Sequence, residues 1–273
     1  MKLLDIIYVI IMSIVEGITE WLPISSTAHL ILVSNLCSPI INKNIFTPSF
    51  MSMFDVVIQL GAILAVVIIF HKRLIPNNKE NIVLWGKVVL ATIPALIVGL
   101  LFDEVIDKVF FNLKTISITL ITYGFVFIFV EKYYKNKDKI HDVNDLSYKK
   151  ALMIGLIQIL AIIPGTSRSG ITIIAGLLLA CNRKTASTFS FFLSIPVMLG
   201  ASSLKTFKYI NAETFTFNHV ILLLIGIAVA FLISMLVVKF LMNFTSKHNF
   251  IGFGYYRILL GIAIIFALLF KFF

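Results

Sequence analysis

Two polar stretches interrupt a chain that is otherwise mostly apolar, and they hold the residues best suited to chemistry. The first runs Glu16-Gly-Ile-Thr-Glu-Trp-Leu-Pro-Ile-Ser-Ser-Thr-Ala-His29. Glu16 and Glu20 are four residues apart, so on a helix their carboxylates share one face. Two carboxylates in such apolar surroundings are costly to ionise, and a divalent cation held between them would relieve the cost. A protonated pair, or pairing with Arg168 alone, is the alternative.

The hydroxyl residues Ser25, Ser26 and Thr27 follow Pro23, an order typical of a helix start. Unpaired N–H groups at a helix N-terminus attract anions such as phosphate, although plain helix capping is the simpler interpretation. His29 lies three residues after Ser26, so one helical turn would bring its imidazole beside this hydroxyl. A hydroxyl, an imidazole and a carboxylate on one wall indicate a nucleophile, a base and a cation ligand.

The second polar stretch is Pro164-Gly-Thr-Ser-Arg-Ser-Gly170. Its glycines permit tight turns, and Thr166 and Ser167 can cap the helix that follows. Arg168 carries a planar guanidinium that suits phosphate binding through two parallel hydrogen bonds. Arg168 would also neutralise Glu16 or Glu20, and the two roles are compatible.

The composition places the chain in a membrane. Apolar residues make up 59% of the 273 positions and charged residues 13%, about half the share usual in soluble proteins. Six apolar segments are long enough to span a bilayer: 54–70, 82–102, 115–131, 187–207, 219–242 and 255–273. We therefore predict an all-α polytopic membrane protein with about six transmembrane helices in a single domain, residues 1–273. The first apolar run is followed by Glu16 rather than a cleavage site, so we expect it to be retained.

Four further apolar segments are too short to span the bilayer, and they form two pairs, 3–15 with 22–36 and 151–163 with 171–181. A polar turn containing proline joins the members of each pair. Irregular backbone at membrane depth survives only where protein or a wet cavity satisfies its polar groups. The two pairs are thus expected to be re-entrant helices around a cavity.

The basic residues orient these segments. The connection 132–150 carries six lysines, and so it is expected on the cytoplasmic side, together with 71–81, Arg183, Lys184, Lys239, Lys247 and Arg257. The acidic connection 103–114 is expected outside. Because the net charge of +10 resides mostly in connections, we expect no nucleic-acid partner. Cys37 and Cys181 have no metal or disulfide spacing.

This orientation predicts an inverted repeat. The first short pair would enter from outside and the second from the cytoplasm, and three spans follow each pair. The halves are approximately 1–131 and 132–273. In such folds the broken-helix turns of the two halves meet near the midplane of the membrane. The two polar stretches would then form one site.

The two stretches closely resemble the signature motifs of the bacterial undecaprenyl-diphosphate phosphatases, the bacitracin-resistance family. The segment Phe54-Asp-Val-Val-Ile-Gln-Leu-Gly-Ala-Ile-Leu-Ala-Val-Val also resembles a third recurrent stretch of that family. The resemblance runs essentially the whole length of the chain. Trp21 stands where phenylalanine is familiar in the family.

The resemblance implies removal of the terminal phosphate of undecaprenyl diphosphate with the help of a divalent cation, Mg²⁺ or Ca²⁺. The reaction recycles the lipid carrier of cell-wall (peptidoglycan) synthesis in the bacterial plasma membrane and confers bacitracin resistance. By resemblance, Glu16 and Glu20 hold the metal and the diphosphate, Ser26 is the nucleophile, His29 the acid or base, and Arg168 the clamp on the transition state. The supporting substrate-binding residues are Ser25, Thr27, Gln59, Thr166, Ser167 and Ser169. Whether Ser26 attacks, or His29 activates water, is left open.

A transporter or flippase of polyprenyl phosphate lipid is the alternative function, because inverted repeats with broken helices are also typical of transporters. A hydroxyl–histidine–carboxylate cluster favours the enzyme, since transport of an anion does not require it. We expect a polyprenyl diphosphate substrate and membrane lipids as partners, and a site facing the external side. A homodimer, the lipid chain-length preference and the native cation are left open.

Overall fold

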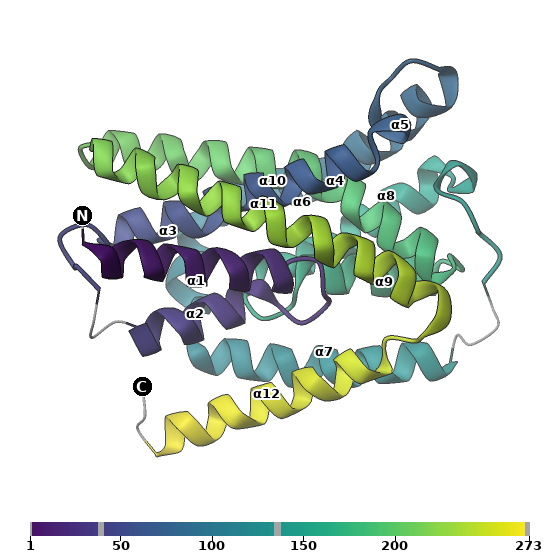
Figure 1. The fold of residues 1–273 in the computed structure, drawn as a ribbon. Helices are drawn as coiled ribbons and strands as arrows, with labels where there is room; N and C mark the ends of the chain where they lie inside the picture. Colours follow the sequence, from purple (N-terminus) through teal and green to yellow (C-terminus); the bar gives the residue numbers. More distant parts are fainter. Residues whose placement is uncertain (1, 38–40, 134–137, 271–273) are drawn as a thin grey trace.

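The computed structural model describes residues 2–37, 41–133 and 138–270. The side chains of Asp103, Glu104 and Asp107, and residues 134–137 of the connection expected in the cytoplasm, lie outside this description. The described residues form a bundle of helices without strands (Figure 1). The elements are α1 (Leu3–Thr19), α2 (Ser26–Cys37), α3 (Pro48–Val57), α4 (Gln59–Ile69), α5 (His71–Leu74), α6 (Lys79–Phe110), α7 (Leu113–Tyr133), η1 (Val143–Asp145), α8 (Tyr148–Gln158), η2 (Ile159–Ile162), α9 (Arg168–Leu178), α10 (Arg183–Ala212), α11 (Phe217–Lys247) and α12 (Ile251–Leu269).

Six helical segments of the described chain are long and apolar enough to cross a membrane, as the sequence predicts. They are Pro48–Ile69, Lys79–Phe102, Leu113–Tyr133, Arg183–Ala212, Phe217–Lys247 and Ile251–Leu269. Several begin before the apolar run itself, because capping residues fix their first turns. Thr47 accepts a hydrogen bond from the Phe50 amide ahead of α3, and Asn182 accepts one from the Thr185 amide ahead of α10.

The expected external connection 103–114 is wrong in extent. Helix α6 continues through Phe110, so that only Phe111 and Asn112 separate it from α7. No glycine or proline interrupts residues 100–110, and acidic side chains do not by themselves end a helix. Asn112 lies at the boundary: its side-chain amide donates to the Val109 carbonyl at the end of α6, and its side-chain oxygen accepts from the Thr115 amide in the first turn of α7.

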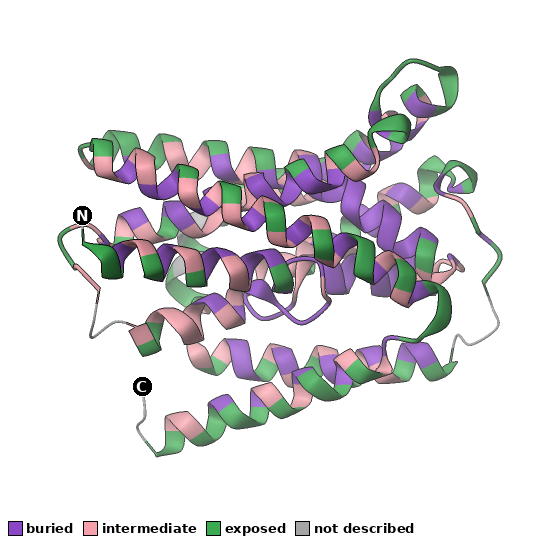
Figure 2. Ribbon diagram, in the orientation of Figure 1, coloured by how far each residue is buried: buried purple, intermediate pink, exposed green. Residues whose placement is uncertain are grey.

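The two short pairs approach the centre of the bundle from opposite ends. In Figure 1 the N-terminus of α1 and the far end of α2 lie at one end of the bundle, whereas α8 and the far end of α9 lie toward the other. The turns 20–25 and 163–167, where each pair reverses, lie inside the bundle, and Figure 2 shows buried loop segments there. Opposite entry is what the inverted repeat requires; the repeat itself, with halves 1–131 and 132–273, stays a prediction.

Apolar side chains cover much of the outer surface, which a membrane core accommodates. Leu100, Leu232 and Leu259 are each more than half exposed, on α6, α11 and α12 respectively. Polar side chains are instead gathered inside, among them Glu16, Ser169 and Arg257, which are almost completely buried. This inside-out distribution is expected where lipid rather than water surrounds the helices. The chain is a multi-pass membrane protein.

Cysteine labelling tests the orientation. We expect Asn112→Cys, between α6 and α7, to react with a membrane-impermeant maleimide in intact cells that express the protein. Lys149→Cys, in the first turn of α8 at the end of the basic connection, should react only after the membrane is permeabilised. Cys37→Ser and Cys181→Ala remove the native thiols from the background. Labelling of position 149 but not 112 in intact cells would reverse the assigned orientation.

Candidate active site

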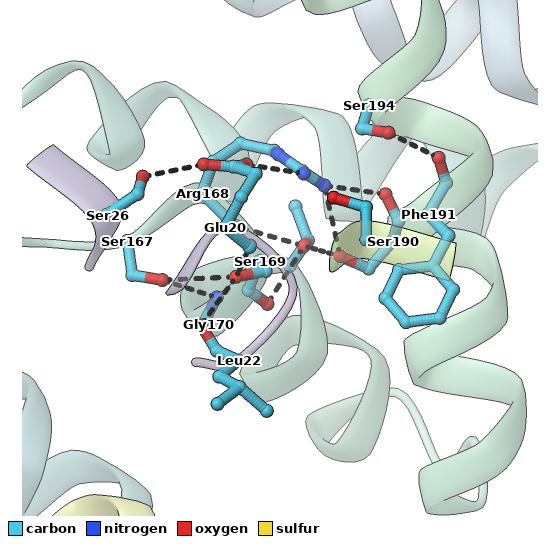
Figure 3. A network of polar contacts seen from close by, with 12 residues as sticks. Glu20, Leu22, Ser26, Ser167, Arg168, Ser169, Gly170, Ser190, Phe191 and Ser194 are labelled. Carbon is cyan, nitrogen blue, oxygen red and sulfur yellow. Dashed lines mark hydrogen bonds and ion pairs between the residues drawn. The ribbon is translucent and has the colours of Figure 1, made fainter. Parts of the chain in front are cut away.

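Glu20 joins the two broken-helix turns. It lies directly after α1, and its carboxylate accepts hydrogen bonds from two residues that each begin a half-helix (Figure 3). Ser26 Oγ donates to Glu20 Oε2 at 2.6 Å, and Arg168 Nη2 donates to Glu20 Oε1 at 2.9 Å. Glu20 and Arg168 are both largely buried, with side-chain exposures of 6% and 11%. The structure thus brings together three of the four predicted catalytic residues.

Arg168 is held from its other side by α10. Its Nη1 donates to the carbonyl oxygen of Ser190 at 2.7 Å, and its guanidinium lies 5.9 Å from the centre of the Trp21 ring. Thr172 Oγ1 lies 2.7 Å from Ser190 Oγ, which keeps this serine in place. The Nε atom of Arg168 has no hydrogen-bond partner among the described residues. The guanidinium is therefore fixed in direction yet keeps a donor for a further anion.

Both turns reach their half-helix through a serine in the left-handed region. Ser25 has φ 74° and Ser167 has φ 72°. Ser25 Oγ accepts from the Ala28 amide at 3.4 Å, and Ser167 Oγ accepts from the Gly170 amide at 3.1 Å. Left-handed backbone is strained for a residue with a Cβ and is retained where the surroundings enforce it. As a result, α2 and α9 begin directly beside Glu20, with their N-terminal amides toward one point.

Ser169 and Gly165 hold the second turn in position. Ser169 Oγ donates to the carbonyl oxygen of Glu20 at 3.0 Å, so that this predicted substrate-binding residue lies against the backbone of the first turn. Gly165 has φ +88°, and a Cβ there would lie 2.0 Å from Thr119 Oγ1. Thr119 in turn donates to the Pro164 carbonyl at 2.7 Å. Only glycine fits this bend.

Arg257 corrects the sequence prediction that placed it in the cytoplasm. It lies within α12, completely buried, and donates hydrogen bonds to both turns. Nη1 contacts the Pro23 carbonyl at 3.1 Å, while Nη2 contacts the carbonyls of Gly165 and Thr166 at 2.9 Å each. A charge-bias count treats every arginine near a helix end as solvated. The signal that identifies Arg257 is its place within an apolar run, where an ionisable residue usually has a structural or functional partner.

Glu16 is buried beside Glu20 but makes different contacts. Glu16 is completely buried, and Gln59, Glu20 and Asp55 lie near its carboxylate. Neither carboxylate oxygen of Glu16 has a hydrogen-bond partner among the described residues. Asp55, which the sequence analysis did not select, has a buried oxygen that also lacks a partner. The sequence feature that could have identified Asp55 is a carboxylate inside the apolar segment 54–70. Unpaired carboxylate oxygens in an apolar interior call for a proton or a cation.

The residues around Glu16 fit part of a cation site. Hard cations such as Mg²⁺ take oxygen ligands, often one or two carboxylates together with substrate phosphates. Among the described residues, no group of three or more His, Cys, Asp or Glu side chains is arranged to hold a metal ion. The protein would therefore supply the oxygens of Glu16, and a phosphate ligand would supply others.

The hydrogen bonds of the His29 ring go to Ser25 and Tyr256 and not to Ser26. Its Nδ1 is 2.7 Å from the Ser25 carbonyl oxygen, and its Nε2 is 2.7 Å from Tyr256 Oη on α12. The spacing of three residues placed His29 and Ser26 on neighbouring turns, but the position of the ring depends on its rotamer and on α12. In this arrangement His29 supports the first turn, and Glu20 is the group that can accept the proton of Ser26.

A cavity of about 270 Å³ opens beside the Glu20 cluster. Its polar lining includes the predicted site residues Glu20, Ser25, Ser26, Thr27, Gln59, Ser167 and Arg168, together with Gln158 and Lys205. Glu16, His29, Thr166 and Ser169 are not among its lining residues, and the last two serve the second turn instead. A cavity with a hydroxyl, a carboxylate, a guanidinium and two helix N-termini is suited to bind and transfer a phosphoryl group.

Comparison with known proteins agrees with this chemistry. The family model described as "Bacitracin resistance protein BacA" matches residues 9–263. An undecaprenyl-diphosphatase of Enterococcus faecalis is 48% identical over 266 residues, which cover 94% of this chain and 95% of that protein. One of Lachnoclostridium phytofermentans is 49% identical, with 96% of each chain covered. An undecaprenyl-diphosphatase 1 of Clostridioides difficile is 48% identical and covers 97% of this chain and 96% of its own.

Replacing Arg257 tests its position between the turns. Arg257→Met has similar length but leaves three buried carbonyl oxygens without their donor, each at a cost of about 1–3 kcal/mol. We expect the free energy of unfolding in detergent to fall by about 3 kcal/mol or more. Arg73→Met is the control, because Arg73 forms an exposed ion pair with Asp142 that contributes at most about 1 kcal/mol. Equal stability of the two variants would contradict the assigned role.

Proposed function

The chain belongs to the bacitracin resistance protein BacA family, and we propose that it hydrolyses undecaprenyl diphosphate at the Glu20 cluster. It is a membrane-embedded hydrolase, an undecaprenyl-diphosphatase, and the hydrolase rather than the transporter interpretation follows from its relatives. The observation that carries the assignment of the site is a single carboxylate, Glu20, that binds Ser26 and Arg168 on the wall of one cavity.

Arg168 is assigned to the phosphate being transferred. Transfer of a phosphoryl group requires mainly that the reactants are positioned and that charge on the phosphate oxygens is stabilised. The Nε donor of Arg168 has no hydrogen-bond partner among the described residues, and residues in the first turns of α2 and α9 line the same cavity. These donors are fixed before substrate arrives, so no reorganisation is needed during the reaction.

Ser26 is assigned as the nucleophile and Glu20 as its base. The Ser26 hydroxyl already donates to Glu20 at 2.6 Å, a distance suited to proton transfer. Ser26 Oγ attacks the terminal phosphorus, its proton passes to Glu20, and the bond from phosphorus to the bridging oxygen breaks. Undecaprenyl phosphate leaves. Water then attacks the phosphoserine, which releases inorganic phosphate and restores the hydroxyl.

His29 is assigned a supporting rather than a chemical role. Both ring nitrogens are engaged, one with the Ser25 carbonyl and one with Tyr256, so that the imidazole stabilises the turn ahead of Ser26. Activation of water by His29 would require the ring to leave Tyr256. The short contact between Ser26 and Glu20 favours attack by the serine.

A divalent cation, Mg²⁺ or Ca²⁺, is proposed to act beside Glu16. The bound cation would neutralise charge on the diphosphate oxygens. Glu16 presents carboxylate oxygens without hydrogen-bond partners, and it lies next to Glu20.

The site is proposed to face the external side of the bacterial plasma membrane. Lys72, Arg73, Lys139, Arg183 and Lys184 lie at or next to the end of the bundle that holds α5, which the positive-inside rule places in the cytoplasm. Helices α6 and α10 both start from that end. Their cavity-lining residues, from Ala95 to Leu100 and from Val197 to Lys205, lie in the second halves of the helices. The cavity therefore extends away from the basic end.

Substitutions in the Glu20 cluster test the mechanism. We expect Arg168→Ala and Glu20→Gln to lower kcat for phosphate release from undecaprenyl diphosphate in detergent by about 100-fold or more. Glu131→Gln is a matched control, because Glu131 also binds an arginine, Arg183, and is as buried as Glu20, at 5% exposure against 6%. This control should keep kcat close to that of the unmodified protein.

The same preparation distinguishes the nucleophile. Acid quenching during turnover of substrate with a radiolabelled terminal phosphate should leave label on Ser26, and Ser26→Ala should abolish both label and turnover. Full activity in Arg168→Ala would refute the site. Turnover in Ser26→Ala would refute only the serine as nucleophile.

Removal of the cation gives an independent test. EDTA should abolish phosphate release, and excess Mg²⁺ or Ca²⁺ should restore it. Because Glu16→Gln removes one carboxylate ligand, we expect the cation concentration for half-maximal activity to rise by about tenfold or more. Asp142→Asn, at the basic end of the bundle, should leave that concentration unchanged. Activity that is indifferent to EDTA would eliminate the cation from the proposal.

A further inference from the structure

The cavity at the Glu20 cluster has a second, apolar part that the phosphate chemistry does not use. It is lined by one stripe of α6, consisting of Ala95, Leu96, Gly99 and Leu100, and by one stripe of α10, consisting of Val197, Met198, Gly200, Ala201 and Leu204. We call these residues the α6–α10 groove. Because residues four apart lie on one helix face, each stripe presents a continuous surface to the cavity.

The glycines of this groove differ from most other glycines of the bundle. A Cβ at Gly61 would lie 2.1 Å from the Ile227 carbonyl oxygen, and one at Gly155 would lie 2.1 Å from the Ala91 carbonyl oxygen. Those two glycines permit close approach of helices, which is the common reason for small residues in membrane helices. At Gly99 a Cβ would meet nothing within 4 Å, and at Gly200 only Leu96 carbons at 3.9 Å. Helix packing does not account for Gly99 and Gly200; they leave space.

A proline precedes each stripe. Pro94 lies inside α6 and Pro196 inside α10, directly before the lining residues begin. Proline removes one helical hydrogen bond and crowds the preceding turn, which bends a helix. The two helices pack against each other, and at the groove a Cβ on Gly200 would lie 3.9 Å from Leu96 carbons. Both helices therefore carry an interruption of the helical hydrogen-bond pattern directly before the residues that line the cavity.

The groove reaches the lipid-facing surface. Leu100, which lines the cavity, is 58% exposed, and Leu199, beside Gly200, is 48% exposed. The space thus runs from Glu20, Ser26 and Arg168 at its polar end to the outer surface between two membrane-spanning helices. A ligand that fits must be anionic at one end and apolar at the other, and must approach from within the membrane.

We propose that the α6–α10 groove binds the first isoprene units of the polyprenyl diphosphate and is the opening through which this lipid enters from the membrane. The proposal rests on the proposed function, since it assigns the tail of the same substrate. A cavity of about 270 Å³ is at the lower limit of pockets that hold drug-sized molecules, so it encloses only the part of the chain next to the diphosphate. The remainder of the tail stays in the bilayer.

Filling the groove at Gly99 tests the proposal. Gly99→Ala, Gly99→Val and Gly99→Leu add increasing volume where no neighbouring atom lies within 4 Å. We expect KM for undecaprenyl diphosphate to rise with side-chain size, by about tenfold or more for leucine, with kcat close to that of the unmodified protein. Gly200→Leu should act in the same direction. Because alanine favours helix more than glycine does, Gly99→Ala should fold at least as stably as the parent chain.

Gly252→Leu is the matched control. Gly252 lies in α12, a Cβ there would also meet nothing within 4 Å, and the residue does not line the cavity. Its KM should equal that of the parent chain. The proposal is overturned if the Gly99 series and Gly252→Leu share one KM. Should the larger side chains prevent folding, seen as aggregation in size-exclusion chromatography, the KM of Gly99→Ala and Gly99→Val decides.

A photoreactive prenyl diphosphate separates this proposal from the catalytic one. With the photoreactive group on the first isoprene unit, the parent chain should be labelled on α6 and α10, and Gly99→Leu should lose that labelling. Labelling there without any phosphate release would retain the groove and refute the catalytic function. Phosphate release with labelling elsewhere would retain the catalytic function and refute the groove. If a phospholipid chain fills the groove instead, excess phospholipid will prevent labelling of α6 and α10 by the probe, whereas excess undecaprenyl phosphate will not. That result also overturns the proposal.

Discussion

The ion pair between Glu20 and Arg168 is the constraint on which the site depends. The two residues are 148 positions apart in the chain and approach from opposite ends of the bundle, yet their side chains meet at 2.9 Å in an interior with little water. Neither charge is stable alone at that depth, because an apolar environment does not replace the hydration energy that a buried charge loses. The pair therefore fixes both turns relative to each other. Ser26, Ser169 and Ser190 add hydrogen bonds to this pair or to the backbone beside it.

The sequence predicts the architecture well because membrane depth imposes simple rules. Segments long enough to span a bilayer are read directly from their apolar length, and the four short segments identify the two re-entrant pairs. The meeting of Glu20, Ser26 and Arg168 was also predictable, since buried charges need partners and each turn offered one side of a pair. The extent of α6 was not, because a helix end at the membrane surface is set by capping at Asn112 rather than by hydropathy.

Contacts that depend on side-chain direction lay beyond the sequence. His29 and Ser26 share a helix, but the imidazole turns to Tyr256, which is 227 positions away. Arg257 was assigned to a connection because charge bias says nothing about which face of a helix a residue occupies. Arg257 is buried because the turns lack hydrogen-bond donors. The carbonyls of Pro23, Gly165 and Thr166 make no regular helical hydrogen bonds, and a membrane interior offers no water to donate to them. Irregular turns at this depth require such a donor.

The charge balance of the site supports the proposed divalent cation. Before substrate binds, Arg168 is matched by Glu20, and the guanidinium of Arg257 is committed to backbone carbonyls. A diphosphate adds roughly two or more negative charges to a cavity that already contains Glu20 and adjoins Glu16. Besides Arg168, which Glu20 already balances, Lys205 is the one other basic residue among the described residues that line the cavity, and a single lysine cannot balance that charge in a medium of low dielectric constant. The divalent cation proposed beside Glu16 would supply what is missing. The site can then remain buried and nearly neutral between turnovers, which is the condition for keeping such polar turns inside a membrane.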